Sequence, residues 1–137
     1  MPFTSTVQVR FADVDSAGIV FYPRYFEMLN AAVEDWFAVE LGLDFRKMHQ
    51  VDRLGVPTVK LNVEFLSPSE MQDQLTITIT PTEVGRASCA FTALFSGEGR
   101  DRLRADVVLV CMDMVTQKAS PWPGGVRQRM VAGLAPA

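Results

Sequence analysis

The chain has one long amphipathic stretch set among segments of alternating polarity. Apolar residues recur at spacings of three and four over residues 24–41, which predicts a helix of about five turns with one apolar face. Elsewhere the period changes to two, which predicts strands. These strands are expected at residues 4–11, 59–65, 75–80, 87–95 and 103–114. Shorter helices are expected at 44–49 and 125–132.

The connections between the last four strands predict how the sheet is assembled. They are short, with turns at 67–69, near Gly85 and at 97–101, and short connections join antiparallel neighbours. One apolar helix is enough to cover one face of such a sheet. We therefore expect an α+β fold in which a curved antiparallel five-stranded sheet wraps around one long central helix. Because one helix cannot protect the sheet edges, we also expect a homodimer or homotetramer.

Length and charge restrict the class of protein. The 137 residues and 48% hydrophobic content fit one domain, residues 1–137, with a well-formed core. The net charge of −3 and the pI near 5.1 provide no positive field for nucleic acid, so we expect no nucleic-acid partner. No apolar run has the length of a membrane span, and the first residues given show no basic segment followed by an apolar one. We expect a cytoplasmic protein that does not bind membranes.

Few residues are suited to metal, cofactor or histidine chemistry. Cys89 and Cys111 fall in apolar strand-like segments, where a thiol usually behaves as a small buried hydrophobic group. His49 is the only histidine and lies in a polar helical segment, where a surface position is expected. We therefore predict no metal site and no cofactor. Aspartate and glutamate side chains therefore remain as the candidate catalytic groups.

The segment between the first strand and the long helix is the candidate site. Asp13, Asp15 and Gly18 form a loop, and Pro23 suits the first helical turn. The N–H groups that open a helix are unpaired and can polarise a carbonyl oxygen. Asp15 is thus a candidate nucleophile or general base, with N–H groups around Tyr22 as oxyanion donors. The alternative is that both aspartates are ordinary turn residues.

The motif VRFADVDSAGIVFYPRYFEMLNAA resembles the hotdog-fold acyl-CoA thioesterases, in particular the 4-hydroxybenzoyl-CoA thioesterase family. The stretch from Asp13 to Tyr22 matches the family pattern of two aspartates, two small residues, glycine, an aliphatic pair, an aromatic residue and tyrosine. The segments VEFLSPSEMQDQL and VGRAS also look like family features. The resemblance spans nearly the whole chain and implies hydrolysis of an acyl-CoA thioester without a cofactor.

The resemblance also implies a role for individual residues. Asp15 would be the catalytic carboxylate, and the Tyr22 N–H would bind the thioester oxygen. Family sites lie between two subunits, so the acyl group would contact one chain's helix and the partner's strand. The implied acyl-binding residues are Tyr25, Asn30, Pro57 and Thr58, and the implied CoA-binding residues are Arg86, Ala87 and Ser88. Asn30 stands where members specific for 4-hydroxybenzoyl groups have an acid, although an amide still bonds a hydroxyl.

Three basic residues and two other functions remain open. Arg100, Arg102 and Arg104 either supplement the CoA phosphate site or form a solvated face near a strand start. A hotdog dehydratase acting on a 3-hydroxyacyl thioester would pair histidine with a carboxylate, and His49 lies outside the loop. A non-catalytic acyl-CoA-binding or scaffolding protein would share the fold.

Overall fold

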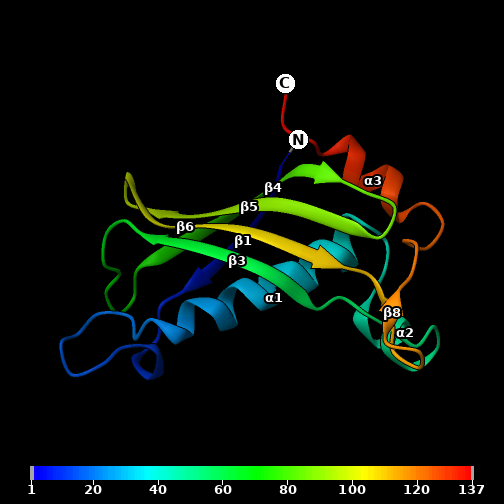
Figure 1. Ribbon diagram of the computed structural model, residues 1–137. Coiled ribbons are helices and arrows are strands. Elements are labelled where there is room, and N and C mark those ends of the chain that lie inside the picture. Colours follow the sequence, from blue (N-terminus) through cyan, green and yellow to red (C-terminus); the bar gives the residue numbers. More distant parts are fainter. Residues whose placement is uncertain (1, 137) are drawn as a thin grey trace.

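The computed structural model describes residues 2–136, in which five strands form one curved antiparallel sheet (Figure 1). The order across the sheet is β1-β4-β5-β6-β3. The predicted five-stranded α+β architecture is thereby confirmed. The strands are β1 Phe3–Gln8, β3 Thr58–Phe65, β4 Gln74–Val84, β5 Ser88–Gly97 and β6 Arg100–Val110.

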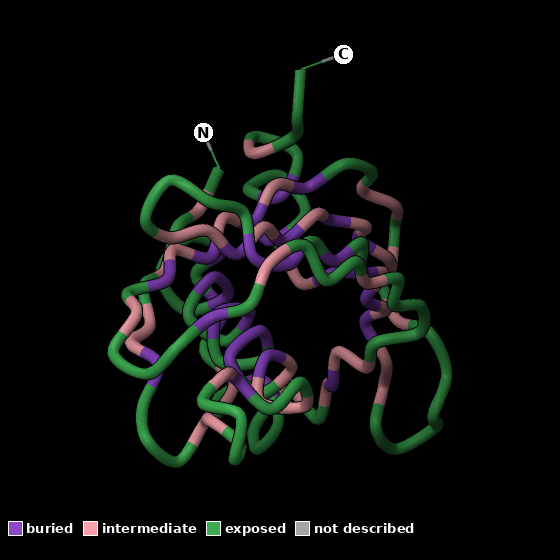
Figure 2. The backbone as a smooth tube through the Cα atoms, turned by 90° about the vertical axis from the view of Figure 1, so that its left-hand side faces the viewer, coloured by how far each residue is buried: buried purple, intermediate pink, exposed green. Residues whose placement is uncertain are grey.

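Helix α1, Pro23–Val39, lies across the inner face of the sheet (Figure 1). Its apolar positions point at the strands, and Trp36 packs edge-on against Phe91 with ring centroids 5.5 Å apart. Figure 2 shows buried positions on the helix and on the strands that face it. Burying each large side chain contributes about 1.5–3 kcal/mol. The buried helix residues are Tyr25, Met28, Leu29, Ala32, Val33, Trp36 and Phe37.

Short elements surround the C-terminal end of α1. Helix α2, Phe45–Gln50, is capped by Asp44, whose carboxylate accepts from the Lys47 N–H at 2.7 Å. Strands β2 Leu54–Gly55, β7 Met112–Asp113 and β8 Lys118–Ala119 form a second, small sheet, and α3 is Val126–Ala132. Both short helices were predicted. No helix in residues 2–136 has the length and apolarity required to cross a membrane.

The bounds of three strands correct the sequence prediction, since β4 also continues to Val84 rather than ending at residue 80. Strand β1 ends at Gln8 rather than at residue 11, because residues 11–13 form a 3₁₀ turn in which the Asp13 N–H donates to the Arg10 carbonyl at 2.9 Å. The last long strand begins at Arg100 and ends at Val110, not at 103 and 114. It starts early because Glu98 and Gly99, both with positive φ, make a tight two-residue turn. It stops early because residues 112–113 join the small sheet.

The main sheet has two distinct ends. The loop end comprises residues 13–22, beside Phe65 and Phe95, and the turn end comprises residues 84–88, beside Thr58 and Cys89. Phe95 follows Cys89 by six positions on β5, so the two ends are about 20 Å apart at roughly 3.3 Å per residue. Figure 1 shows the two ends on opposite sides of the molecule, with α1 running between them.

Candidate active site

Asp15 lies in a tight turn whose hydrogen bonds fix its backbone. Its N–H donates to the Ile19 carbonyl at 3.0 Å, and its carbonyl accepts from the Gly18 N–H at 3.0 Å. Gly18 has φ +81°, a conformation that favours glycine. One carboxylate oxygen of Asp15 accepts from the Ala17 N–H at 2.9 Å. The side chain is exposed and takes part in no ion pair among the described residues.

The start of α1 offers a backbone donor next to this turn. Within residues 2–136 the Tyr22 N–H donates to no main-chain carbonyl, whereas the Arg24 N–H bonds to Phe21 at 2.9 Å. Pro23 has no N–H, so Tyr22 carries the outermost free donor at the positive end of the helix dipole. The Phe21 N–H donates to the Asp13 carbonyl at 2.8 Å, which ties the helix start to the turn.

A hollow of about 320 Å³ adjoins this donor. Tyr25 lines it with its ring but is only 4% exposed, and its hydroxyl donates to Ser69 Oγ at 2.9 Å. The sequence motif implied that Tyr25 binds the acyl group. In the structure its hydroxyl already donates its hydrogen bond to Ser69. The hollow is lined by Ile19, Val20, Tyr22, Tyr25, Phe65, Leu66, Ser67 and Pro68.

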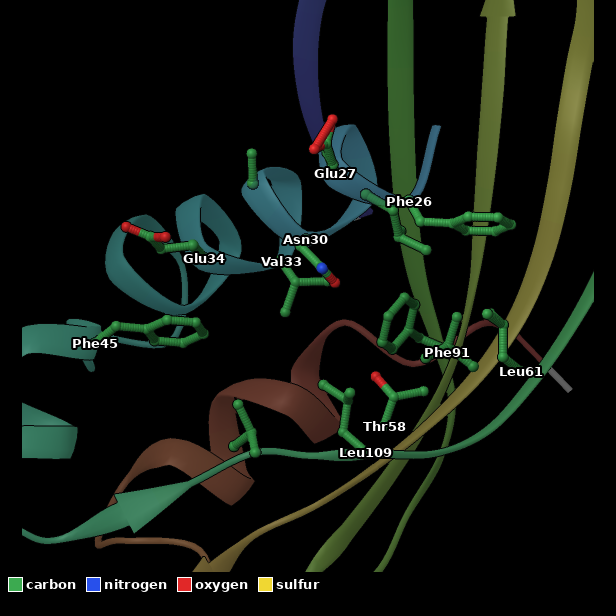
Figure 3. Close-up of a pocket in the computed structure, with 14 residues that line it drawn as sticks. Phe26, Glu27, Asn30, Val33, Glu34, Phe45, Thr58, Leu61, Phe91 and Leu109 are labelled. Carbon is green, nitrogen blue, oxygen red and sulfur yellow. The ribbon is translucent and has the colours of Figure 1, made fainter. Parts of the chain in front are cut away.

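A larger groove of about 730 Å³ opens between α1 and the β6–β3 side of the sheet. Its walls are mainly apolar and include Phe26, Phe45 and Phe91. Figure 3 shows the Asn30 amide projecting from α1 toward Phe91 and Thr58 on the opposite wall, while the carboxylates of Glu27 and Glu34 point away. Two of the expected acyl-binding residues, Asn30 and Thr58, therefore line one groove.

The other expected binding residues lie near the turn end. Pro57 lines a separate hollow with Phe45 and His49, and its carbonyl accepts from the Val110 N–H at 3.2 Å. Arg86 is exposed in the β4–β5 turn. The carbonyls of Ala87 and Ser88 accept from the Cys111 N–H at 2.7 Å and from Trp122 Nε1 at 3.0 Å. The Arg127 guanidinium also donates to the Gly85 and Val84 carbonyls, at 3.1 and 3.3 Å, so that Arg86 is the exposed basic side chain of a turn held by several hydrogen bonds.

A buried ionic network behind the loop was missed at the sequence level. The Arg102 side chain is fully buried and forms an ion pair with Asp73 at 2.8 Å. This corrects both expectations for Arg102, because the residue neither faces solvent nor can reach a CoA phosphate. Arg104 is exposed, 3.9 Å from the carboxylate of Asp106, and Arg100 is exposed.

The ion pair changes the acidity of Asp73. Partial burial acts to raise the pKa of this carboxyl, but hydrogen bonds from Arg102 and the Glu70 N–H, together with the positive charges of Arg102 and Arg100, outweigh burial. The pKa of Asp73 is therefore held below its ordinary value of 3.8. Asp73 is consequently charged at neutral pH.

The remaining reactive side chains lie away from the loop. Cys89 and Cys111 are fully buried, as predicted, and burial raises the pKa of Cys89 to about 12 and that of Cys111 to about 11. His49 is exposed on α2, and its Nδ1 is 2.7 Å from the Phe45 carbonyl oxygen. Helix α2, which carries His49, lies at the opposite end of α1 from the 13–22 segment (Figure 1).

Comparison with known proteins identifies the family. A family model described as the thioesterase-like superfamily matches residues 9–130. A 1,4-dihydroxy-2-naphthoyl-CoA hydrolase of Thermosynechococcus vestitus is 31% identical over 116 residues, 84% of this chain and 79% of that protein. A 4-hydroxybenzoyl-CoA thioesterase of Pseudomonas sp. is 36% identical over 76 residues, 54% of this chain and 53% of that protein. The crystal structure of a 1,4-dihydroxy-2-naphthoyl-CoA thioesterase from Synechocystis has a TM-score of 0.86 at 25% identity, with 96% of each chain covered. The chain therefore belongs to the thioesterase-like superfamily, and its hotdog fold and relationship to aryl-CoA thioesterases agree with the resemblance found in its sequence motif.

Proposed function

We propose that this thioesterase hydrolyses a hydroxylated aryl-CoA to the free acid and CoA. The observation that carries the proposal is the free Tyr22 N–H at the start of α1, tied by backbone bonds to the turn that carries Asp15. A thioester needs little acid assistance because its thiolate leaves readily. A positioned carboxylate and an oxyanion donor are then sufficient chemical machinery.

Two routes use this machinery. In the first, an Asp15 oxygen attacks the thioester carbon, the Tyr22 N–H stabilises the oxyanion, and CoA leaves as thiolate. Water then cleaves the mixed anhydride and regenerates the carboxylate. In the second, Asp15 removes a proton from water as the water attacks the same carbon. A single turnover in H₂¹⁸O tests the first route, because water that attacks the aspartyl carbon of the anhydride puts ¹⁸O into Asp15, whereas the second route puts ¹⁸O only into the released acid.

The groove beside α1 suits an aromatic acyl group. Its volume of about 730 Å³ lies within the roughly 300–1,000 Å³ common for small-molecule sites. Apolar walls surround the Asn30 amide, which donates and accepts hydrogen bonds, so a ring hydroxyl finds a partner there. The named substrates of the relatives above carry aromatic hydroxyls, which supports this choice of acyl class.

Two copies are needed to bring the parts of the site together. Asp15 and Arg86 are at opposite ends of one sheet, yet a thioester and its CoA phosphates must contact both if Arg86 binds phosphate. Strand β3 is a free edge with Val59, Leu61 and Phe65 exposed by 58%, 45% and 56%. Antiparallel pairing of two β3 edges places the loop end of one copy beside the turn end of the other. We propose this dimer as the active unit.

Thioester hydrolysis is tested with a panel of aryl-, short-chain and long-chain acyl-CoAs. Wild type is expected to release CoA most rapidly from a hydroxylated aryl-CoA. Asp15→Ala should reduce kcat by about a hundredfold or more, a hundredfold being the low end of the rate acceleration that a general acid or base usually contributes. Asp13→Asn is the matched control, because it changes the neighbouring aspartate. A folded Asp15→Ala variant with unchanged kcat would refute the mechanism, and no CoA release from any substrate would favour a binding protein.

The dimer is tested by placing a charge on the free edge. Val59→Lys should lower the dimer fraction measured by light scattering and lower activity in parallel. Val39→Lys is the control, because Val39 is also exposed, at 72%, but lies at the end of α1. Equal effects of the two substitutions would count against β3 as the interface.

A further inference from the structure

A buried guanidinium is connected through Ser69 to the segment that carries Asp15. Phe95 pairs with Leu103, but Ser96 pairs with Asp101, so Arg102 is the extra residue of a β-bulge. A bulge redirects a side chain to the other face of a strand. The Arg102 side chain consequently enters the protein interior, where it is 0% exposed.

The buried charge is satisfied by side chains and carbonyls from two segments, residues 68–73 and the end of β5 at Gly97. Its Nη1 donates to Asp73 Oδ2 at 2.8 Å, to Ser69 Oγ at 3.1 Å and to the Pro68 carbonyl at 3.1 Å. Its Nε and Nη2 donate to the Gly97 carbonyl at 3.3 and 3.0 Å. Charge-assisted bonds in a dry interior are strong and directional, so they fix the 68–73 segment.

Ser69 connects this fixed segment to both parts of the candidate site. Its hydroxyl accepts from the Tyr25 hydroxyl at 2.9 Å, in the first turn of α1. Its carbonyl accepts from the Val20 N–H at 2.9 Å, in the segment that leads from the Asp15 turn to Tyr22. Ile19 also bridges to Glu70. One buried residue thus holds the turn and the helix start at a set separation.

We propose that Arg102, acting through Ser69, is a positioning group that sets the Asp15 carboxylate against the Tyr22 N–H. This inference rests on the proposed thioester hydrolysis. Small misplacement of reacting groups is costly to chemistry but not to binding. Because the acyl groove and the Arg86 turn lie elsewhere, loosening the network lowers kcat and leaves KM nearly unchanged.

The test removes single hydroxyls from the network. Tyr25→Phe and Ser69→Ala should each lower kcat about tenfold, with KM within twofold of wild type, at a temperature well below every melting transition. Because the two side chains share one hydrogen bond, the double variant should lose less than the product of the two single losses. The control is Thr92→Val, which removes the Thr92–Asp106 bond at 3.1 Å on the outer face of the sheet. It should leave kcat within twofold.

A second measurement does not depend on activity. Amide hydrogen exchange in residues 13–22 should accelerate at least tenfold in Tyr25→Phe and Ser69→Ala, whereas exchange in β5 stays unchanged. Unchanged exchange in 13–22 would overturn the inference, as would unchanged kcat or a rise of KM alone. Failure of the proposed function looks different: wild type would then cleave no acyl-CoA, while the exchange result would still decide whether the network positions the loop.

Discussion

Removing the charge of Asp73 should expose how much the buried ion pair contributes to stability. Asp73→Asn keeps the size and one acceptor oxygen of the side chain but leaves the Arg102 guanidinium buried without a counter-charge. Breaking a buried pair from one side costs about 3–5 kcal/mol. Because 13% of the Asp73 side chain remains exposed, we expect the low end, about 3 kcal/mol, and a melting temperature lower by roughly 10 °C.

The size of this loss should depend on pH in a direction set by the pKa. The pKa of Asp73 is lower in the folded protein than the ordinary value of 3.8. Because the pKa is lower in the folded protein than in the unfolded chain, the charged Asp73 stabilises the fold at any pH above the unfolded-state pKa. This stabilisation is lost as the pH falls through the folded-state pKa. The difference between wild type and Asp73→Asn should therefore be constant from about pH 7 to 5 and shrink below about pH 4.

Urea unfolding followed by tryptophan fluorescence measures the loss, since Trp36 and Trp122 are both buried. Protein concentration is held fixed because association shifts apparent stability. Asp106→Asn is the control, because the Asp106 side chain is 51% exposed and 3.9 Å from Arg104, and such surface pairs contribute at most about 1 kcal/mol. Equal losses for the two variants, or a difference that persists unchanged in acid, would refute the reasoning.

Three further outcomes are expected. Arg86→Ala should raise KM for acyl-CoA about tenfold or more and make that KM depend less on salt concentration, while the rate of hydrolysis of small non-CoA thioesters stays within twofold of wild type. Equal losses of activity on the two kinds of substrate would indicate a structural role for Arg86. Cys89 and Cys111 should not react with a thiol reagent at about pH 8 until the protein unfolds, since only the thiolate reacts; rapid labelling would show that the sheet opens. Asn30→Ala should lower kcat/KM for hydroxybenzoyl-CoA about three- to tenfold and spare benzoyl-CoA, a difference that competition between the two substrates measures directly.

The fold was largely predictable because the helical and the strand-like spacings of its apolar residues each continue without interruption. Spacings of three and four mark α1, and alternation marks the long strands, so helix, strands and antiparallel order follow from local pattern. The end of β1 was less predictable, because the Asp13 carboxylate accepts from the Arg10 N–H at 2.8 Å and draws residues 10–13 into a turn. Such competition between a side chain and the sheet leaves no mark on hydrophobic periodicity.

Arg102 shows why part of the site region could not be read from the chain. Alternation places Arg100, Arg102 and Arg104 on one face, but a bulge shifts the register by one residue and turns Arg102 inward. Its partner Asp73 is 29 residues away in sequence, so only the folded chain brings the two charges together. In contrast, the Asp15 turn and the helix start are local, and the sequence motif was sufficient to locate them.

The separation of the loop end from the turn end has a genetic consequence. In the proposed edge-paired dimer, each chain would lend its Asp15 carboxylate to one reaction centre and its Arg86 guanidinium to the other. Asp15→Ala and Arg86→Ala chains would each be defective alone. On random mixing, half of the dimers contain one chain of each kind, and in such a dimer both substitutions fall in one centre while the other centre is intact. About one centre in four would therefore be intact. Two impaired alleles in one cell would thereby restore an activity that neither encodes by itself.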